Sequence, residues 1–148
     1  MTVGSPEHTL GIVRRGLLWV LAFAFVGLEA ELLLLGHTEE WTQWIPVVGL
    51  GLALLALGVV VLRPSRLAVQ LFRILMGLLI VAGIAGLILH YRGNAEFELE
   101  TRPSMAGLEL IRKSLTGATP ALAPGSLIPL GWLGLIAVWK YPRLEDVT

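Results

Sequence analysis

Apolar residues occur in long runs along this chain, and most polar residues lie in the segments between them. Four runs are long enough, or nearly long enough, to cross a bilayer as helices, at about residues 16–36, 45–62, 71–90 and 124–140. A bilayer core about 30 Å thick needs roughly 20 mostly apolar residues in helical form. Backbone groups inside lipid must bond within the chain. The pattern therefore predicts an all-α integral membrane protein, a single domain over residues 1–148 that forms a bundle of four transmembrane helices.

The fourth run differs from the others because prolines and a glycine interrupt its beginning. Pro120, Pro124 and Gly125 precede or open it, so this helix is expected to be short. Pro129 falls in or just after the first turn, where proline is tolerated. At the other end of the chain, residues 1–13 are expected to form a loose tail before the first apolar run.

The basic residues predict which side of the membrane each polar segment occupies. With the N-terminus inside, seven Lys and Arg residues lie in inner segments and four in outer segments. Cytoplasmic segments favour basic residues, so we expect a multi-pass protein of the plasma or inner membrane with both termini cytoplasmic. Arg73, near the start of the third run, is expected to extend to the inner interface and pair with lipid phosphate.

The outer segment between the third and fourth runs, at about residues 91–123, is long enough to hold structure of its own. Its first half alternates acidic with apolar residues, which is typical of a strand or an extended segment. These acids form a solvated face, a docking surface for a basic partner or a weak calcium site, and they are Glu96, Glu98 and Glu100. Its second half predicts a short amphipathic helix over residues 104–117, capped by Ser104 and lying in the outer interface.

Composition supports a membrane protein and excludes several functional classes. The chain is 55% hydrophobic and 15% charged, with net charge 0 and no cysteine. An ordinary soluble domain is about 45–50% apolar and about 25% charged. The balanced charge argues against nucleic-acid binding, and the lack of cysteine excludes thiol chemistry and thiolate metal sites. The chain has no Gly-x-Ser-x-Gly, His-Glu-x-x-His or Walker motif, so we expect no enzymatic activity.

Small residues are concentrated in the second, third and fourth runs. Burial does not drive helix association in lipid, whereas small residues that permit close approach do. These positions predict a compact bundle that contacts the lipid bilayer and either a second copy of the chain or other membrane subunits. The glycines expected to pack are Gly49, Gly51, Gly58, Gly83, Gly86, Gly131 and Gly134.

Two glutamates lie inside the first apolar run, where carboxylates are unfavourable. A charged residue at a helix centre costs about 2.5–3.5 kcal/mol, so Glu29 and Glu31 are expected to be protonated, paired or turned toward a polar interior. Residues two apart in a helix point about 200° apart, so the two cannot share a face. Continued helical spacing would group Glu29 with His37 and Glu40, and His90 ends the third run on the same outer side.

Three interpretations of these residues are open. In the first, the carboxylates bond to neighbouring helices or outer arginines, and the chain is a non-enzymatic subunit or accessory protein of a membrane complex. In the second, Glu29 and Glu31 handle protons or cations in a small oligomeric transporter or channel. In the third, His37 and His90 hold a haem or, with carboxylates, a divalent metal. No spacing matches a specific metal motif, so no cofactor is predicted.

Overall fold

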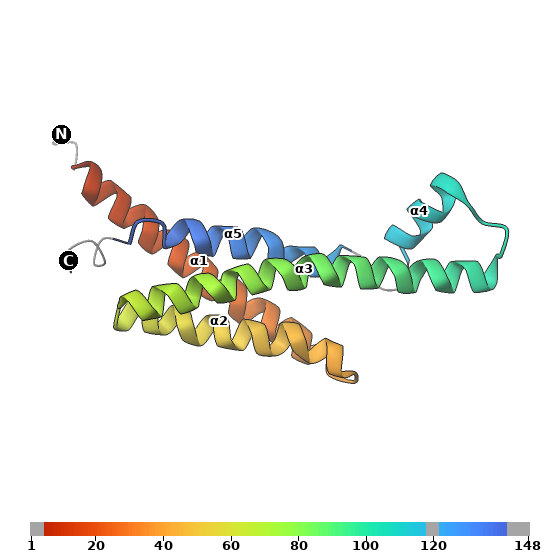
Figure 1. Cartoon of the computed structure of the whole chain (residues 1–148), viewed down its shortest axis with the longest axis horizontal. Helices are drawn as coiled ribbons and strands as arrows, with labels where there is room; N and C mark the ends of the chain where they lie inside the picture. Colours follow the sequence, from red (N-terminus) through yellow and green to blue (C-terminus); the bar gives the residue numbers. More distant parts are fainter. Residues whose placement is uncertain (1–4, 118–121, 142–148) are drawn as a thin grey trace. The chain divides into compact units, whose positions relative to one another are not determined.

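The computed structural model describes residues 5–117 and 122–141, and within them it shows helices and turns but no strand (Figure 1). The predicted all-helical class is therefore confirmed. Three helices are long and apolar enough to cross a membrane, which agrees with a membrane protein. They are α1 (Pro6–Leu34), α2 (Trp44–Leu62), which follows the 3-10 turn η1 (Trp41–Gln43), and α3 (Arg66–Thr101).

The chain forms two compact units. The first contains residues 1–79 and 130–148, and the second contains residues 80–129. The first unit therefore holds α1, α2, the beginning of α3 and most of α5 (Leu127–Ala137). The second unit holds the rest of α3, the short helix α4 (Gly107–Leu115), the 3-10 turn η2 (Ala123–Ser126) and the start of α5.

The first helix begins earlier than its apolar run. The Ser5 side chain accepts a hydrogen bond from the backbone N–H of His8, and Pro6 occupies the first helical position. A serine cap followed by proline is a strong start for a helix, because proline lacks only a donor that would be unpaired there. The expected loose tail over residues 1–13 is therefore wrong from Pro6 onward.

The same helix ends at a glycine in the left-handed region. Gly36 has φ 64° and donates its N–H to the carbonyl of Leu33, while His37 donates to the carbonyl of Leu32 at 2.9 Å. This pair of bonds is a Schellman motif, which satisfies the last carbonyls of a helix and turns the chain away from the helix axis. The residues after Gly36 consequently do not continue the face of α1.

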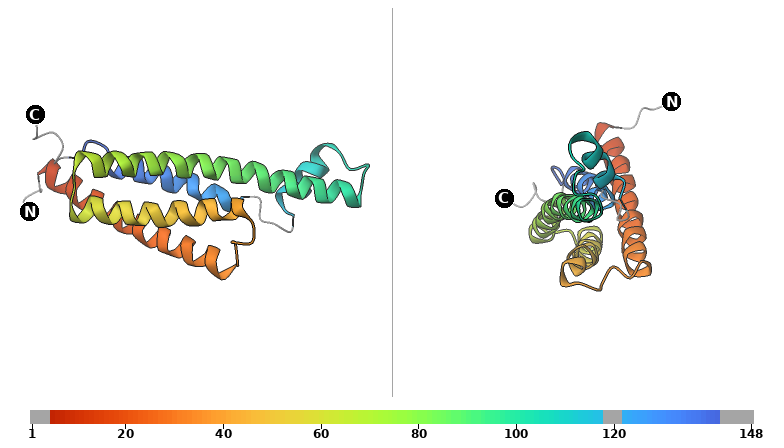
Figure 2. Two further views of the ribbon diagram at one scale, coloured as in Figure 1. Left: turned by 60° about the horizontal axis from the view of Figure 1, so that its bottom comes forward. Right: turned by 90° about the vertical axis from the view of Figure 1, so that its right-hand side faces the viewer.

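The core of the first unit lies where its helices meet. The fully buried large side chains include Phe25 of α1, Leu50 of α2 and Phe72 and Met76 of α3. Figures 1 and 2 show α2 running alongside the beginning of α3, to which a short turn at Arg63–Ser65 connects it. Most other large apolar side chains of the three long helices are exposed, as expected of surfaces that face lipid or another protein.

The third helix continues beyond its apolar run, through the glutamate segment. The extended or strand-like conformation expected for Glu96–Glu100 is wrong, because α3 is helical as far as Thr101. No proline or glycine interrupts residues 94–101, and Glu98 forms an i,i+4 ion pair with Arg102 at 3.0 Å. Pro103 then disfavours helix at the preceding residue and ends it. Alternating polarity over only five residues was too short a pattern to distinguish a strand from a helix.

The predicted short helix of the outer segment is present as α4, but it is shorter than expected. It begins at Gly107, after Ala106, rather than at the expected cap Ser104, and it ends at Leu115 rather than Gly117. Met105 donates its N–H to the carbonyl of Arg102 instead, which closes a turn between α3 and α4. Residues 102–105, around the expected cap Ser104, therefore form a turn that reverses the direction of the chain.

The fourth apolar helix is shorter than the predicted span over residues 124–140. The turn η2 and helix α5 together form one apolar helical stretch, Ala123–Ala137, below the roughly 20 residues that a typical bilayer requires. Pro129 lies in the first turn of α5, as predicted. The helix ends at Ala137, and Lys140 follows in the left-handed region with φ 45°.

Candidate functional site

Glu29 lies where α1 packs against α2, with its carboxylate opposite a glycine. Its Oε1 atom is 3.9 Å from the point that a Cβ atom on Gly51 would occupy. Its Oε2 atom is buried and has no hydrogen-bond partner among residues 5–117 and 122–141. Gly51 therefore leaves space for the carboxylate without offering a side-chain donor. A buried acceptor without a donor costs about 1–3 kcal/mol, so Oε2 of Glu29 destabilises the contact between α1 and α2.

Glu31 is exposed, whereas Glu29 is half-buried, which is consistent with the different faces expected from helix geometry. In the part of the chain that the structure describes, the Glu31 carboxylate has no hydrogen bond or ion pair. The neighbouring Leu34 and Leu35 are 87% and 74% exposed. A carboxylate therefore stands on an otherwise apolar surface near the end of α1.

The expected helical grouping of Glu29, His37 and Glu40 is wrong, because α1 ends before the last two of these residues. The left-handed Gly36 turns the chain, so His37 is half-buried in a turn. Glu40 is exposed and immediately precedes η1. A spacing of i+8 or i+11 shares a face only while the helix continues, which is why the sequence pattern failed here.

His90 lies on α3 in the second unit, where its Nδ1 atom is buried. Glu29, His37 and Glu40 belong to the first unit. Across the described ranges, no group of three or more His, Asp and Glu side chains is placed so that it could hold a metal ion. The candidate ligands His37 and His90 therefore have no completed set of metal ligands around them in these ranges.

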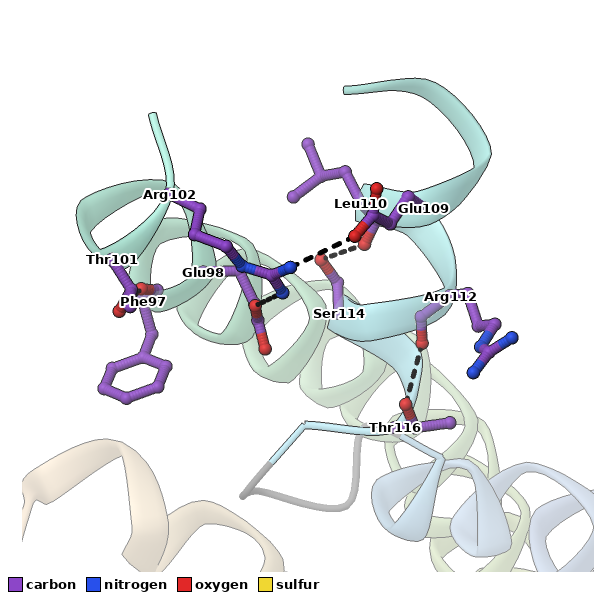
Figure 3. A network of polar contacts seen from close by, with 9 residues as sticks. All are labelled: Phe97, Glu98, Thr101, Arg102, Glu109, Leu110, Arg112, Ser114 and Thr116. Atoms are coloured by element: carbon purple, nitrogen blue, oxygen red, sulfur yellow. Dashed lines mark hydrogen bonds and ion pairs between the residues drawn. The ribbon is translucent and has the colours of Figure 1, made fainter. Parts of the chain in front are cut away.

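Polar contacts hold α4 against the end of α3 (Figure 3). The guanidinium of Arg102 donates to Glu98 of α3 at 3.0 Å and to Glu109 of α4 at 3.1 Å. These groups are partly exposed, and such ion pairs contribute about 0–1 kcal/mol each. These two ion pairs therefore orient α4 relative to the end of α3 but add little to the stability of the second unit.

A buried amide contributes more to this attachment. The Nδ2 atom of Asn94 donates to the backbone carbonyl of Ser114 at 2.8 Å, and both residues are buried. A Cβ atom at Gly117 would approach the Asn94 amide to 2.6 Å. Position 117 therefore requires glycine, because a larger residue would clash with the Asn94 amide that holds the end of α4. A single asparagine in α3 and a glycine after α4 did not stand out in the sequence.

The three glutamates of the outer segment separate onto two faces. Glu98 faces α4 and pairs with Arg102, whereas Glu96 and Glu100 are exposed. Among the described residues, neither exposed carboxylate forms a hydrogen bond or an ion pair. Residues four apart share a helix face, so Glu96 and Glu100 form a small acidic surface on α3.

The apolar face of α4 is uncovered. Leu108 is 80% exposed, and Ile111 and Leu115 beside it are also exposed. A shallow hollow adjoins this face and is lined by Leu108, Glu109, Arg112 and Lys113. The helix therefore presents both apolar and basic groups, a combination typical of helices at membrane interfaces.

A group of cationic residues gathers at the other end of α3, within the first unit. Arg14 of α1 donates from Nε to the carbonyl of Ala137 at 3.0 Å, and from Nη2 to Trp139 and Lys140 at 3.0 and 3.2 Å. The last carbonyls of a helix lack internal donors, so an arginine supplies what the end of α5 needs. Arg14 also lies 5.4 Å from the centroid of the Tyr141 ring.

Two further contacts complete this arrangement. Arg73 of α3 donates to the carbonyl of Val138 at 2.8 Å, and the hydroxyl of Tyr141 donates to Val60 of α2 at 3.4 Å. The first contact was not expected from the sequence, which predicted only that Arg73 extends to the inner interface and pairs with lipid phosphate. We name this region the basic end, and its cationic residues are Arg14, Arg15, Arg63, Arg66, Arg73 and Lys140. The sequence indicated this region through the basic residues beside the apolar runs. It did not indicate the hydrogen bonds that join them.

The glycines expected to pack differ in what surrounds them. A Cβ atom at Gly83 or Gly86 would come within 2.9 and 2.6 Å of Ile128 and Pro124, and one at Gly134 would collide with Met76. Gly131 is buried, and Gly49 would meet Leu79 at 3.2 Å. Gly58 faces open space within 4 Å. Close approach thus occurs mainly where the fourth apolar helix meets α3.

Comparison with models of protein families, with curated proteins and with solved structures finds no match.

Proposed function

We propose that this chain is a non-enzymatic integral membrane subunit that contacts another membrane protein chain through the Glu31 face of α1. The exposed Glu31 carboxylate on an apolar helix carries this proposal. Lipid is a poor environment for a carboxylate, at a cost of about 2.5–3.5 kcal/mol near a helix centre and less toward the interface. A polar partner inside or beside the bilayer removes that cost, and polar contacts of this kind join membrane helices.

Four membrane crossings, with both termini cytoplasmic, are part of this proposal. Three helices have sufficient length, and the fourth stretch, Ala123–Ala137, is about 25 Å long if its 3-10 and α-helical rises are added. A short span is accommodated by local thinning of the bilayer at modest cost. Arg14 and Arg73 satisfy the carbonyls at its end, which makes a stable terminus at a membrane interface.

The length of α3 supports a part that stands outside the bilayer. A helix of 36 residues has a contour length of about 54 Å, well above the roughly 30 Å of the hydrocarbon core. Its last third carries Arg92 and the glutamates, which water stabilises better than lipid. We assign this third and α4 to the outer side, where Glu96 and Glu100 offer a second contact surface for the partner.

Co-purification after gentle solubilisation tests this proposal. The native protein is expected to leave the membrane in an assembly larger than its own 16.0 kDa, and the measured mass distinguishes copies of this chain from a different subunit. Glu31→Lys should dissociate the assembly, whereas Glu39→Lys changes the charge equally in the exposed turn after α1 and should leave it intact. A native protein that elutes as a lone chain without partners would contradict the proposal.

A second candidate function is proton or cation handling in a small oligomeric transporter or channel. It is favoured by the buried Oε2 atom of Glu29, which lacks a partner among the described residues. Intramembrane acids of this kind often mark ion pathways. In proteoliposomes, Glu29→Gln should abolish flux, and the isosteric Glu31→Gln should not. Flux no greater than that of empty liposomes would exclude this candidate.

A further inference from the structure

The basic end contains more cationic groups than its internal contacts use. Arg14 and Arg73 donate to carbonyls at the end of α5. Arg15, Arg63 and Lys140 are exposed, and the described ranges give their side chains no hydrogen bond or ion pair. We propose that the basic end binds the headgroups of anionic phospholipids. This inference rests on the membrane insertion proposed above and adds a specific class of lipid.

Internal contacts bring the cations of three chain segments together. The Tyr141 hydroxyl bonds to Val60 near the end of α2, and the Arg14 guanidinium lies over the Tyr141 ring. Lys140 directly precedes Tyr141, and Arg63 follows Val60 by less than one helical turn. The tyrosine therefore connects the basic flank of α1, the end of α2 and the segment after α5. The exposed cations extend from this connection.

No acidic residue lies among the cations of these segments, and the nearest ones before and after them in the sequence are Glu7, Glu145 and Asp146. Residues 8–15, 60–73 and 137–141 contain no aspartate or glutamate. The ion pairs of the second unit, by contrast, join Arg102 to two glutamates. A lipid phosphate supplies the missing negative charge, and arginine binds phosphate oxygens with paired, geometrically matched donors.

Aromatic side chains place this region at headgroup depth. Trp19 is 77% exposed one turn after Arg15, and Trp139 is 68% exposed next to Lys140. Exposed tryptophans prefer the boundary between lipid tails and headgroups. The apolar α2 ends at Leu62 and Arg63 follows at once, so the guanidinium begins where the hydrocarbon run stops. Clusters of basic residues directly beside membrane helices favour anionic headgroups.

Lipid retention by the purified full-length protein tests this inference. The protein is equilibrated with equal amounts of phosphatidylglycerol and phosphatidylcholine in detergent, and the lipids that remain bound are counted by native mass spectrometry. Each Lys or Arg near an anionic surface contributes about fivefold in affinity. The wild type should therefore retain the anionic lipid at least about tenfold more than the zwitterionic one, and R15Q/R63Q/K140Q should lose that preference.

A matched variant separates a specific surface from net charge. R92Q/R112Q/K113Q removes the same number of cations from the second unit and should keep the wild-type preference. R15K/R63K/K140R retains the charges and should also keep it, which guards against a folding defect in the glutamine variant. High salt should weaken retention, because exposed charges are screened. Added inorganic phosphate should not displace the lipid.

Four outcomes would overturn the inference: equal retention of both lipids by the wild type, equal loss in the matched variant, insensitivity to salt, or displacement by inorganic phosphate. Alkaline carbonate extraction of membranes distinguishes this failure from failure of the proposed function. A protein that carbonate releases is not inserted, and the proposed function then fails as well. A protein that stays in the membrane but shows no lipid preference contradicts only the lipid site.

Discussion

The Nε atom of Arg14 donates a 3.0 Å hydrogen bond to the carbonyl oxygen of Ala137, although 123 positions separate the two residues in the sequence. The bond joins the first helix to the end of the last one. Because the same guanidinium also donates to the carbonyls of Trp139 and Lys140, one side chain binds three carbonyl oxygens at and just after the end of α5.

Replacing this arginine should therefore destabilise the first unit. We expect Arg14→Gln to lower the free energy of unfolding by about 1–3 kcal/mol, since hydrogen bonds from a charged donor are lost and carbonyls are left without donors. Thermal unfolding in detergent, followed by circular dichroism, measures the effect. Arg15→Gln removes the same charge from an exposed neighbour and should change stability little. Equal loss in both variants would show that charge alone matters.

The contact between α5 and α3 should depend on the absence of a side chain at Gly134. A methyl group at Gly134 would collide with Met76, so Gly134→Ala is expected to cost about 1–3 kcal/mol of stability by overpacking. Gly58→Ala is the matched control, because nothing lies within 4 Å of its added methyl group. That change should be neutral or slightly stabilising in the same helical context. A neutral Gly134→Ala would contradict the observed packing.

The attachment of α4 should depend on Asn94. Asn94→Ala removes the donor to the Ser114 carbonyl and leaves a buried acceptor unsatisfied, at a cost of about 1–3 kcal/mol. Hydrogen exchange of the α4 amides should become faster, while exchange in α2 should not change. Glu96→Gln, on the exposed face of α3, serves as the control and should leave α4 protected. Unchanged α4 exchange in Asn94→Ala would count against this attachment.

The absence of cysteine permits a direct test of topology. Arg63→Cys marks the turn before α3 and Ser104→Cys marks the turn after it, and neither native residue bonds through its side chain in the described ranges. If α3 crosses the membrane once, an impermeant maleimide applied to intact cells should label Cys at 104 and reach Cys at 63 only after lysis. Labelling of both positions in intact cells would exclude this crossing.

The apolar pattern predicted where helices lie better than where they end. Three long apolar runs correspond to three long helices, because lipid-compatible length and apolarity are properties of each run itself. The ends depend on local chemistry: Pro6 begins α1 early, and Gly36 ends it. Glu96–Glu100 was expected to be a strand or an extended segment because acidic and apolar residues alternate there, yet α3 continues through it because no proline or glycine interrupts residues 94–101.

Side-chain partners were harder to predict than helices. Glu29 and Glu31 were separated correctly by helix geometry, since two residues suffice for that inference. His37 and Glu40 were misplaced because helical spacing was continued past residue 36, although the predicted run ends there and Gly36 turns the chain. The bonds of Arg14 and Asn94 connect residues far apart in sequence, and no periodicity within one segment encodes them.

Lys140 occupies a backbone conformation that glycine would adopt without strain. Its φ of 45° costs a residue with a Cβ atom about 1–2 kcal/mol, which the greater freedom of an unfolded glycine offsets by about 0.4–1 kcal/mol. A glycine at this position would thus give a more stable chain with one positive charge fewer. If the basic end binds anionic lipid as proposed, stability and lipid attraction favour different residues at this one position.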